Sequence, residues 1–384
     1  MENMSWFSYI CRHNNETYKM KKIAICTLMA MIATTATLQA KEKSEVRVIE
    51  VGQDVDAANE GVIFALPTTM LRVRVEAEVE MCKVGPYYRY SNKYLNLTDV
   101  VTEDKTTWRL ISATISSYGK SGDQNTQKYK MIAMNAVCPS VCTTSDGVIM
   151  GVNVEAQQPI NETISQEMEL PVLTFDNVQL DRTILTKTST ATMAEEAALS
   201  IYDLRDKRLS LLGGEEPVVL QDAGSYEKVL SEIDRLEKDL VSMFAGKRVK
   251  VRVVKYYDIM PDCYGASSQV LLRFSDKDGF LDAMDLNGKP VYVDMSFTKP
   301  SQVNALSAQS KERRAKPLYG LRYIQPATVN VKVIDRNKLI GESNVLCSQG
   351  GQILTLPADV LLQSNVSIKL SPVTGALEYI KYNK

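Results

Sequence analysis

The residue types best suited to ligand binding in this sequence are tyrosines that lie close together. The run Gly85-Pro-Tyr-Tyr-Arg-Tyr90 is followed by Lys93-Tyr94, so four tyrosines fall within eight residues. Tyrosine combines a large contact area with a polar tip, which suits an aromatic surface for a sugar or a peptide. With 18 Tyr against 7 Phe in the chain, core packing beneath the first sheet is the alternative role. The candidate ligand-binding residues are Tyr87, Tyr88, Arg89, Tyr90 and Tyr94.

Two arginines fall where an amphipathic helix normally carries apolar residues. Projected at about 100° per residue, Arg205 and Arg208 lie within the apolar stripe that contains Ile201. A cation that faces a core needs a partner. The two arginines therefore either pair with carboxylates of the next helix, such as Asp234 or Glu237, or bind an anion such as a carboxylate or a sulfate.

Catalytic chemistry is limited by the single histidine, His13, which lies in the part of the chain that we expect to be removed on export. The mature chain then lacks Ser-His-Asp and Cys-His nucleophilic machinery, His-ligated zinc and His acid/base catalysis. Carboxylate chemistry, Ser-Lys chemistry, and a Tyr or Cys nucleophile remain open. No metal and no cofactor is expected, because the partial calcium-loop pattern Asp276-Lys-Asp278-Gly279 has Phe280 where an oxygen ligand belongs, and no phosphate loop or dinucleotide fingerprint is present.

The N-terminal region has the pattern of a secretory signal. Met20-Lys-Lys22 precedes the uncharged run 23–38, and Leu38-Gln39-Ala40 provides a small-residue cleavage site before Lys41. A retained membrane anchor is the alternative, although the run is short for a span. We expect residues 1–19 to be a spurious extension, residues 20–40 to be a signal peptide, and no transmembrane span to remain after its removal. The mature protein is expected in the periplasm or at the cell surface.

Charge and cysteine content suit an exported protein without a nucleic-acid partner. The formal net charge is −1, which gives no electrostatic reason to expect nucleic acid or an anionic membrane. Signal removal leaves five cysteines, so at least one thiol is unpaired in a monomer. Cys138 and Cys142 form the one close pair, and the sequence leaves open whether they form a disulfide. A metal role is not expected, because their spacing is not C-x-x-C and no second pair supplies further ligands.

The elements that position these residues are mostly strands. Residues 71–79 alternate apolar and charged side chains, which predicts a strand with one buried face and one wet face. We expect segment 61–67 to pair with this strand as a hairpin. Two helical patterns follow, the first with a capping box at Thr192 and Glu195, and short strands then continue to the C-terminus.

Together these patterns predict an α+β, mainly β fold, with antiparallel sheets in sandwich-like domains and a central helical hairpin. We expect an N-terminal β-rich domain at residues 41–188, the helical hairpin at 189–246 and a C-terminal β-sandwich-like domain at 247–384.

Several stretches together resemble a known family. They are the tyrosine run 85–95, the helix from Ala194-Glu-Glu-Ala-Ala to Leu204-Arg-Asp-Lys-Arg208, Met243-Phe-Ala-Gly246 and Arg273-Phe-Ser-Asp-Lys-Asp-Gly279, with shorter matches at 61–67, 320–323, 356–357 and 374–377. Over nearly all of the mature chain they resemble exported proteins from Gram-negative gut anaerobes that are catalogued as a domain of unknown function. The resemblance implies export and β-rich parts around the helical pair, and it carries over no activity, substrate or catalytic residue. The sequence departs from the family pattern at Ala245 and at Cys347-Ser348.

The function that these observations favour is a non-catalytic binding or assembly module of the cell envelope, whose partner is an envelope protein or a glycan. Export, near-neutral charge and the many tyrosine-bearing strands motivate it. One alternative is an envelope hydrolase that uses two carboxylates held within about 5 to 10 Å of one another. Another alternative is a subunit of a surface appendage or adhesin.

Overall fold

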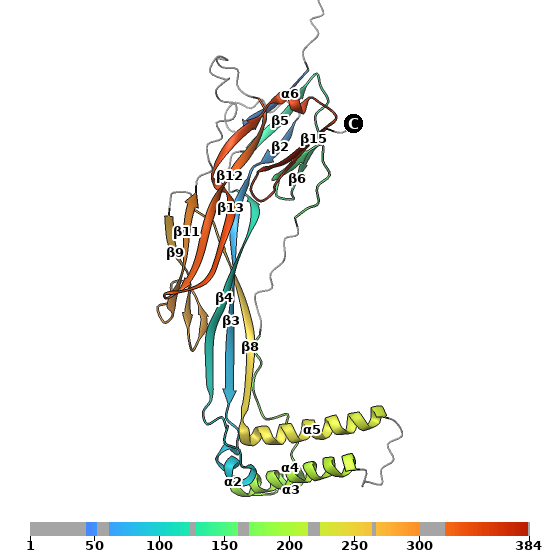
Figure 1. The fold of residues 1–384 in the computed structure, drawn as a ribbon, viewed down its shortest axis with the longest axis vertical. Helices are drawn as coiled ribbons and strands as arrows, with labels where there is room; N and C mark the ends of the chain where they lie inside the picture. The colour runs from blue at the N-terminus through green and yellow to red at the C-terminus, as the bar shows by residue number, and fades with distance from the viewer. Residues whose placement is uncertain are drawn as a thin grey trace, which may run out of the picture.

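The protein is long and narrow, with β-sheets along its length and a pair of helices that projects sideways at one end (Figure 1). This computed structural model describes residues 44–51, 61–122, 128–159, 169–213, 223–262, 266–298 and 319–382. The predicted signal peptide, the N-terminal extension and His13 lie outside the described residues. The predicted fold class is confirmed, because most of the described elements are antiparallel strands.

The strands are β1 (Glu45–Val51), β2 (Val62–Ala65), β3 (Pro67–Lys83), β4 (Lys105–Ser121), β5 (Lys128–Met134), β6 (Val141–Thr143), β7 (Ile149–Val152), β8 (Lys247–Ile259), β9 (Ala266–Ser275), β10 (Gly279–Leu281), β11 (Lys289–Thr298), β12 (Leu321–Asp335), β13 (Lys338–Leu356), β14 (Val366–Leu370) and β15 (Leu377–Tyr382). The helices are the 3-10 helix η1 (Tyr88–Tyr90), α2 (Ser91–Leu95), α3 (Arg182–Leu185), α4 (Thr190–Gly213), α5 (Ala223–Ala245) and α6 (Ala358–Leu361).

The middle of the molecule is a β-sandwich that we call the stem. One sheet has the strand order β4-β3-β8 and the other has the order β10-β9-β11-β12-β13. Both sheets contribute to a single apolar core, which includes Leu71, Val75, Leu272 and Val331, all with 0% exposure. On one side the two sheets come very close at Gly341 of β13. A Cβ atom at this position would lie 2.2 Å from the carbonyl oxygen of Ala113 in β4, so only glycine allows the approach.

The predicted alternation in residues 71–79 is confirmed in β3, the central strand of its sheet. Its apolar residues from Leu71 to Val79 are buried in the stem core, and the charged residues between them lie on the other face. Several of those charges form cross-strand ion pairs, such as Arg72 with Asp258 of β8 at 2.8 Å. Period-two alternation therefore gave the strand and its buried face correctly.

The second β region lies above the stem, at the end away from the helices (Figure 1). Its sheets have the orders β1-β5-β2 and β15-β14-β7-β6, and they share a core with the upper ends of β12 and β13, for example through Leu321 and Ile324. The expected hairpin of segment 61–67 with β3 is wrong. β2 pairs with β5 instead, from Val62 opposite Met131 to Ala65 opposite Lys128.

The two halves of the chain share their sheets. β8, which follows the helices, pairs with β3 from Leu71 opposite Ile259 to Lys83 opposite Lys247. β14, near the C-terminus, pairs with β7. The helical hairpin between the expected boundaries at residues 188 and 246 is therefore an insertion between strands, and the strands before and after it pair in shared sheets.

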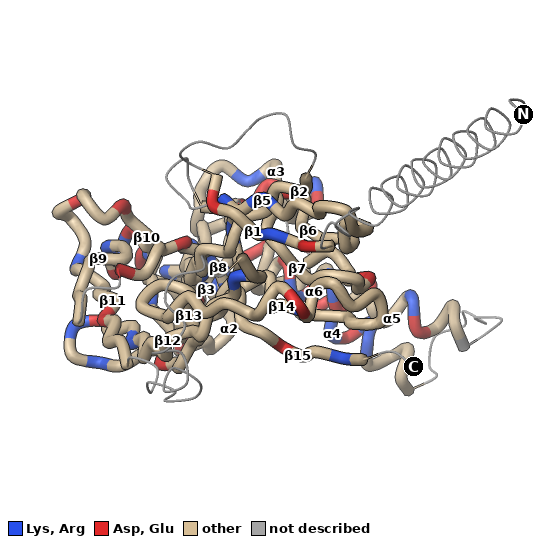
Figure 2. Tube along the Cα trace, turned by 90° about the horizontal axis from the view of Figure 1, so that it is seen from above, with Lys and Arg blue, Asp and Glu red and all other residues tan. Residues whose placement is uncertain are grey.

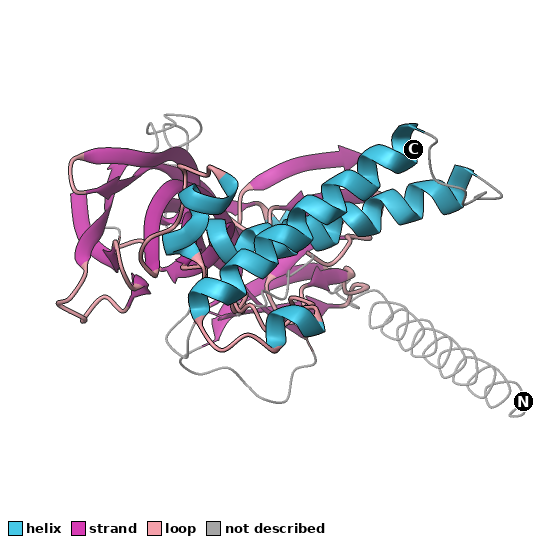
Figure 3. Cartoon of the chain, turned by 90° about the horizontal axis from the view of Figure 1, so that it is seen from below, coloured by secondary structure: helices cyan, strands magenta, loops and turns pink. Residues whose placement is uncertain are grey.

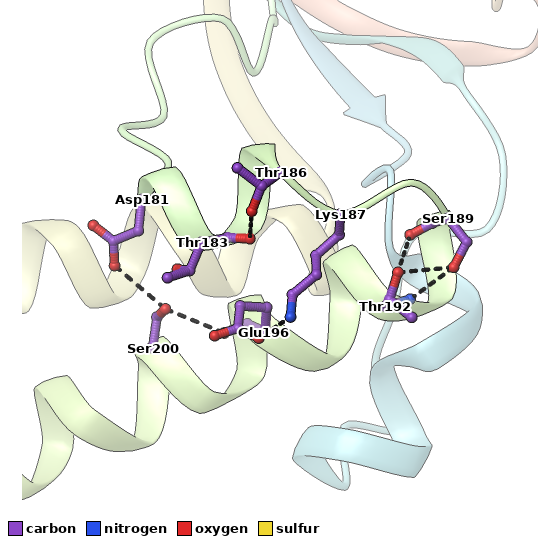
Figure 4. A network of polar contacts seen from close by, with 8 residues as sticks. All are labelled: Asp181, Thr183, Thr186, Lys187, Ser189, Thr192, Glu196 and Ser200. Carbon is purple, nitrogen blue, oxygen red and sulfur yellow. Dashed lines mark hydrogen bonds and ion pairs between the residues drawn. The ribbon is translucent and has the colours of Figure 1, made fainter.

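Helices α4 and α5 form an antiparallel hairpin whose far ends reach beyond the strands when the molecule is seen from below (Figure 3). The first helix begins earlier than its predicted capping box. Ser189 caps it, since the Ser189 Oγ accepts a hydrogen bond from the Thr192 amide at 3.2 Å (Figure 4). Gly246 ends α5 with a left-handed φ of +83°, as the sequence predicts. No described helix combines the length and the apolar character that a membrane span requires.

Candidate functional site

We call the lower end of the molecule the foot, which comprises residues 85–97, α3 and the α4–α5 hairpin. Two backbone hydrogen bonds meet at the end of α5. Within the foot, the Tyr87 amide donates to the Met243 carbonyl at 2.9 Å, and the Val101 amide, on the segment that leads into β4, donates to the Ala245 carbonyl at 2.8 Å. Gly85 allows the tyrosine run to approach α5, because a Cβ atom there would lie 2.2 Å from the Met243 carbonyl oxygen. The foot is therefore fixed to the stem through main-chain contacts at the base of α5.

Tyr87 lies in the core of the foot. Its side chain is 4% exposed, and its ring is 5.4 Å from the ring of Phe244. Burial raises the pKa of the Tyr87 hydroxyl above its usual value. The core that receives this tyrosine is formed with the helical hairpin, through residues such as Ile201 and Leu240. Tyr87 therefore has the alternative role of core packing, but not beneath the first sheet, where that role was predicted.

The remaining residues of the run are partly or fully exposed, and Tyr90 and Tyr94 also pack against the foot core. Together with Tyr202 of α4 we call them the tyrosine face, which comprises Tyr88, Arg89, Tyr90, Lys93, Tyr94 and Tyr202. The rings of Tyr90 and Tyr94 lie 6.1 Å apart, and the Lys93 ammonium lies 4.5 Å from the Tyr94 ring. A hydrogen bond to Tyr94 raises the pKa of Lys93. Tyr202, which the sequence analysis did not select, donates its hydroxyl to the Tyr94 carbonyl at 2.8 Å and links this face to α4.

Arg205 and Arg208 meet the carboxylates that the sequence offered as partners. Arg205 Nε lies 2.7 Å from Glu237 Oε1, and Arg208 Nε lies 3.1 Å from Asp234 Oδ1. These ion pairs join α4 to α5, which is the first of the two predicted roles, and they balance the two cations without a bound anion. The arginine side chains are 41% and 46% exposed, and both follow Ile201, the last buried residue of α4, along the same stripe.

Burial in the hairpin is confined to its base. On α4 the buried residues end at Ile201, and on α5 those that belong to the foot core begin at Leu240. The described part of the hairpin also shows large apolar side chains on its surface, both beside this buried base and beyond it. On α4 these are Leu199 (58% exposed), Tyr202 (44%), Leu209 (66%) and Leu212 (57%). We call these four residues the apolar row.

A fixed spacing on the helix brings part of the apolar row together. Leu199, Tyr202 and Leu209 are separated by three and seven residues, which places them along one side of a helix. That side lies about 90° from the stripe that packs on α5. The sequence analysis considered only the stripe that faces α5. The spacing of the apolar residues outside it was the signal that could have identified the row.

The other candidate residues lie away from the foot. Cys138 and Cys142 are present as free thiols, and no bridge joins them. Within the described ranges, no group of three or more His, Cys, Asp or Glu side chains is placed to hold a metal ion. Basic and acidic residues are interspersed along the described chain (Figure 2), a distribution that keeps a surface soluble.

Fold and foot together define a class of protein: a mainly β scaffold of two stacked sheet regions that carries a helical hairpin at one end. The chain belongs to the family described as a domain of unknown function, DUF4831, whose model matches residues 60–378. The match begins before β2 and ends within β15, so it includes the stem, most of the upper β region and the foot. The predicted resemblance to a domain of unknown function is thereby confirmed. Searches of curated proteins and of solved structures gave no match.

Proposed function

We propose that this protein is an exported, non-catalytic binding or assembly module of the cell envelope, and that its foot contacts the partner. One observation carries this proposal: the hairpin projects from the end of the stem with the apolar row on its surface. Large apolar side chains that gather on one exposed region of a folded protein indicate an interaction surface. The four residues of the row are each at least 44% exposed.

The shape of the hairpin supports a role in contact with a partner. With 24 residues, α4 is about 36 Å long. Only its first half is buried against the rest of the foot. A partner that covers the exposed side of α4, including Leu209 and Leu212 in the second half, would bury apolar area at about 25 cal/mol per Å².

The tyrosine face extends the same surface toward the stem. Tyr202 belongs to both the apolar row and the tyrosine face, since its hydroxyl bonds to the Tyr94 carbonyl. Tyrosine and arginine are enriched at protein interfaces, where ring area and a polar tip act together. This combination favours an envelope protein as the partner, and a glycan is the other outcome that the experiment below distinguishes.

The location is inferred from sequence. A charged start, an apolar centre and a small-residue end precede Lys41, and the family resemblance implies export. A module without a catalytic role also fits a mature chain that contains no histidine, since the only histidine is His13.

Co-sedimentation with defined envelope fractions tests this proposal. Purified protein 41–384 is mixed separately with peptidoglycan sacculi, with lipopolysaccharide and with protein-containing outer-membrane vesicles from a Gram-negative gut anaerobe. We expect binding to the vesicles and its loss when they are treated with protease. Leu209→Asp is expected to weaken binding at least tenfold, because it places a charge in the apolar row.

The matched control is Leu339→Asp, a similarly exposed leucine on β13 of the stem, at 49% exposure. Both variants are expected to keep the melting temperature of the unmodified protein, because both side chains are already in water. Equal binding by the two variants would show that the foot is not the contact. Turnover of a glycan, peptide or ester by the purified protein would show that the module is an enzyme.

A further inference from the structure

Among the residues that the structure describes, the stem sandwich is closed on one side and open on the other. On the closed side, Gly341 of β13 lies against β4. On the open side, β8 is the edge strand of its sheet, and β10 covers only the end of β9, from Arg273 to Ser275. Among the described strands, residues 266–272 of β9 therefore also form a sheet edge. Two strand edges, one from each sheet, border the same opening.

A cavity of about 480 Å³ lies at this opening. Its walls are consecutive residues from both strands, 256–260 at the end of β8 and 269–271 of β9. Successive side chains of a strand point to opposite faces, so a pocket that opens on one face of a sheet is lined by alternate residues. Lining by consecutive residues means that the strand edges themselves form the walls. We call this cavity the edge slot.

The volume of the edge slot can be compared with that of a strand. A strand rises about 3.3 Å per residue, lies about 4.8 Å from its neighbour and occupies a layer about 10 Å thick, which gives roughly 160 Å³ per residue. The slot therefore has room for about three residues of extended chain. Its β9 wall is also three residues long.

We propose that the edge slot receives an extended segment of a partner polypeptide, which adds a strand between β8 and β9. The exposed edges of two strands offer alternating amide donors and carbonyl acceptors, and an extended main chain is the ligand that matches this pattern. Sugars and small anions present no such repeat. This inference concerns the stem and does not depend on the proposed role of the foot.

The side chains at the slot specify the inward face of such a segment. Ile259 and Leu271 are each 9% exposed and belong to the stem core, so a residue that faces them must be apolar. Asp258 is held by Arg72 at 2.8 Å and by the Tyr118 hydroxyl at 3.0 Å, so its charge is already balanced. The segment that fits alternates an apolar inward side chain with an outward one that faces solvent.

A peptide library with that alternation tests the proposal. The probe is a set of acetylated heptapeptides with Lys at both ends and inner positions that alternate between apolar (Val, Ile, Ala) and polar (Thr, Ser) residues. We expect immobilised protein 41–384 to retain members of this set and, with the retained peptide added, amide exchange at residues 256–260 and 269–271 to slow at least fivefold. The same peptide with a central Pro is expected to bind at least tenfold less tightly, because Pro lacks an amide donor.

Two variants distinguish peptide binding at the edge slot from nonspecific adsorption of peptide to the protein. Gln269→Trp narrows the slot at its exposed β9 wall, and Ser296→Trp adds the same ring on the neighbouring strand β11. We expect the first to reduce peptide retention at least tenfold and the second to leave it unchanged, with both proteins melting as the unmodified one does. Equal retention by both variants, equal binding of the Pro peptide, or absence of any retained peptide would overturn the proposal. Slowed exchange at the slot that accompanies dimer formation without peptide would assign it to a second copy of the chain and overturn the partner assignment.

Discussion

The stem and the foot use the same kinds of apolar residue, but they enclose them to different extents. Among the described residues, the stem core contains 22 buried residues drawn from both sheets. The core of the foot contains 11, all at the base of the hairpin and the segments beside it. The stem can therefore hold its shape without help, whereas the outer half of the hairpin depends on a few surface contacts.

Those contacts are individually weak. The outer half of the hairpin is held by the ion pairs of Arg205 and Arg208 and by the Tyr226 hydroxyl, which donates to the Leu211 carbonyl at 2.8 Å. Exposed ion pairs contribute about 0.2 to 1 kcal/mol each. Segments with few buried contacts open at low free-energy cost. The difference between the two regions suits a rigid support that presents an adaptable contact element.

Removal of the largest ring at the base of the hairpin is expected to have the largest effect. Phe244 is fully buried and packs on Tyr87, so Phe244→Ala should cost about 3 to 5 kcal/mol. Because this ring belongs to the foot core alone, the loss should appear as fast amide exchange in α4 and α5. Strands β3 and β12 should keep their protection, as measured by hydrogen exchange with mass spectrometry.

The matched change in the stem is Leu272→Ala, which truncates a side chain with 0% exposure in the stem core. It should cost about 2 to 5 kcal/mol and raise exchange in the strands of both stem sheets. If Phe244→Ala also released the stem strands, the foot would be part of one cooperative unit with the stem, and the contrast between the two regions would fail.

Alkaline pH is expected to weaken the stem through Tyr257 of β8. The loss should be less than about 2.7 kcal/mol, the equivalent of two pKa units, because the side chain keeps part of its contact with solvent. Burial raises the pKa of this tyrosine from 10.0 to about 12, with a smaller contribution from Asp282. Tyr257 therefore ionises at lower pH in the unfolded chain than in the folded protein. Its contribution to the free energy of unfolding is constant below pH 10 and is lost as the pH rises from 10 to about 12. We expect the urea midpoint to follow this course.

Tyr257→Phe is the control, since it removes the titrating hydroxyl and keeps the ring. The drop between pH 10 and 12 should then become smaller by the contribution of this one group. An unchanged alkaline profile in Tyr257→Phe would assign the loss to other groups. Tyr87 is the tyrosine to examine next, because burial raises its pKa as well and it lies in the foot.

Local patterns in the sequence predicted the parts of this fold that depend on neighbouring residues. The alternation around Leu71 gave β3 and its buried face, because period-two patterning is a property of the strand itself. The two helices followed from their apolar periodicity, and projection on a helix of fixed geometry gave pairing of Arg205 with Glu237 as one of two possible roles. The actual N-cap of α4, Ser189, was missed because two cap signals, Ser189 and Thr192, lie within four residues of one another.

Long-range pairing was beyond the reach of these patterns. β8 pairs with β3 although the whole foot separates them in sequence, and β2 pairs with β5 instead of its neighbour β3. Alternation states which face of a strand is buried and not which strand lies beside it. In the candidate site, Tyr87 could not be separated from Tyr90 and Tyr94, because its burial depends on Phe244, about 160 residues away. The edge slot arises from strand order alone and left no local signal.

The smallest expected effect concerns the ion pairs of the hairpin, and it decides between the two roles of Arg205 and Arg208. A double-mutant cycle of Arg205→Ala with Glu237→Ala should give a coupling of about 0.2 to 1 kcal/mol, measured as local stability of α4 and α5 by amide exchange. The cycle of Arg208→Ala with Asp234→Ala should give less, because Asp234 is 51% exposed whereas Glu237 is 18% exposed. Both couplings should shrink in 1 M salt, where the Debye length is about 3 Å. Stabilisation of the hairpin by sulfate that disappears in Arg205→Ala would instead reveal an anion site. In its absence, the arginines act as ion-pair links between α4 and α5.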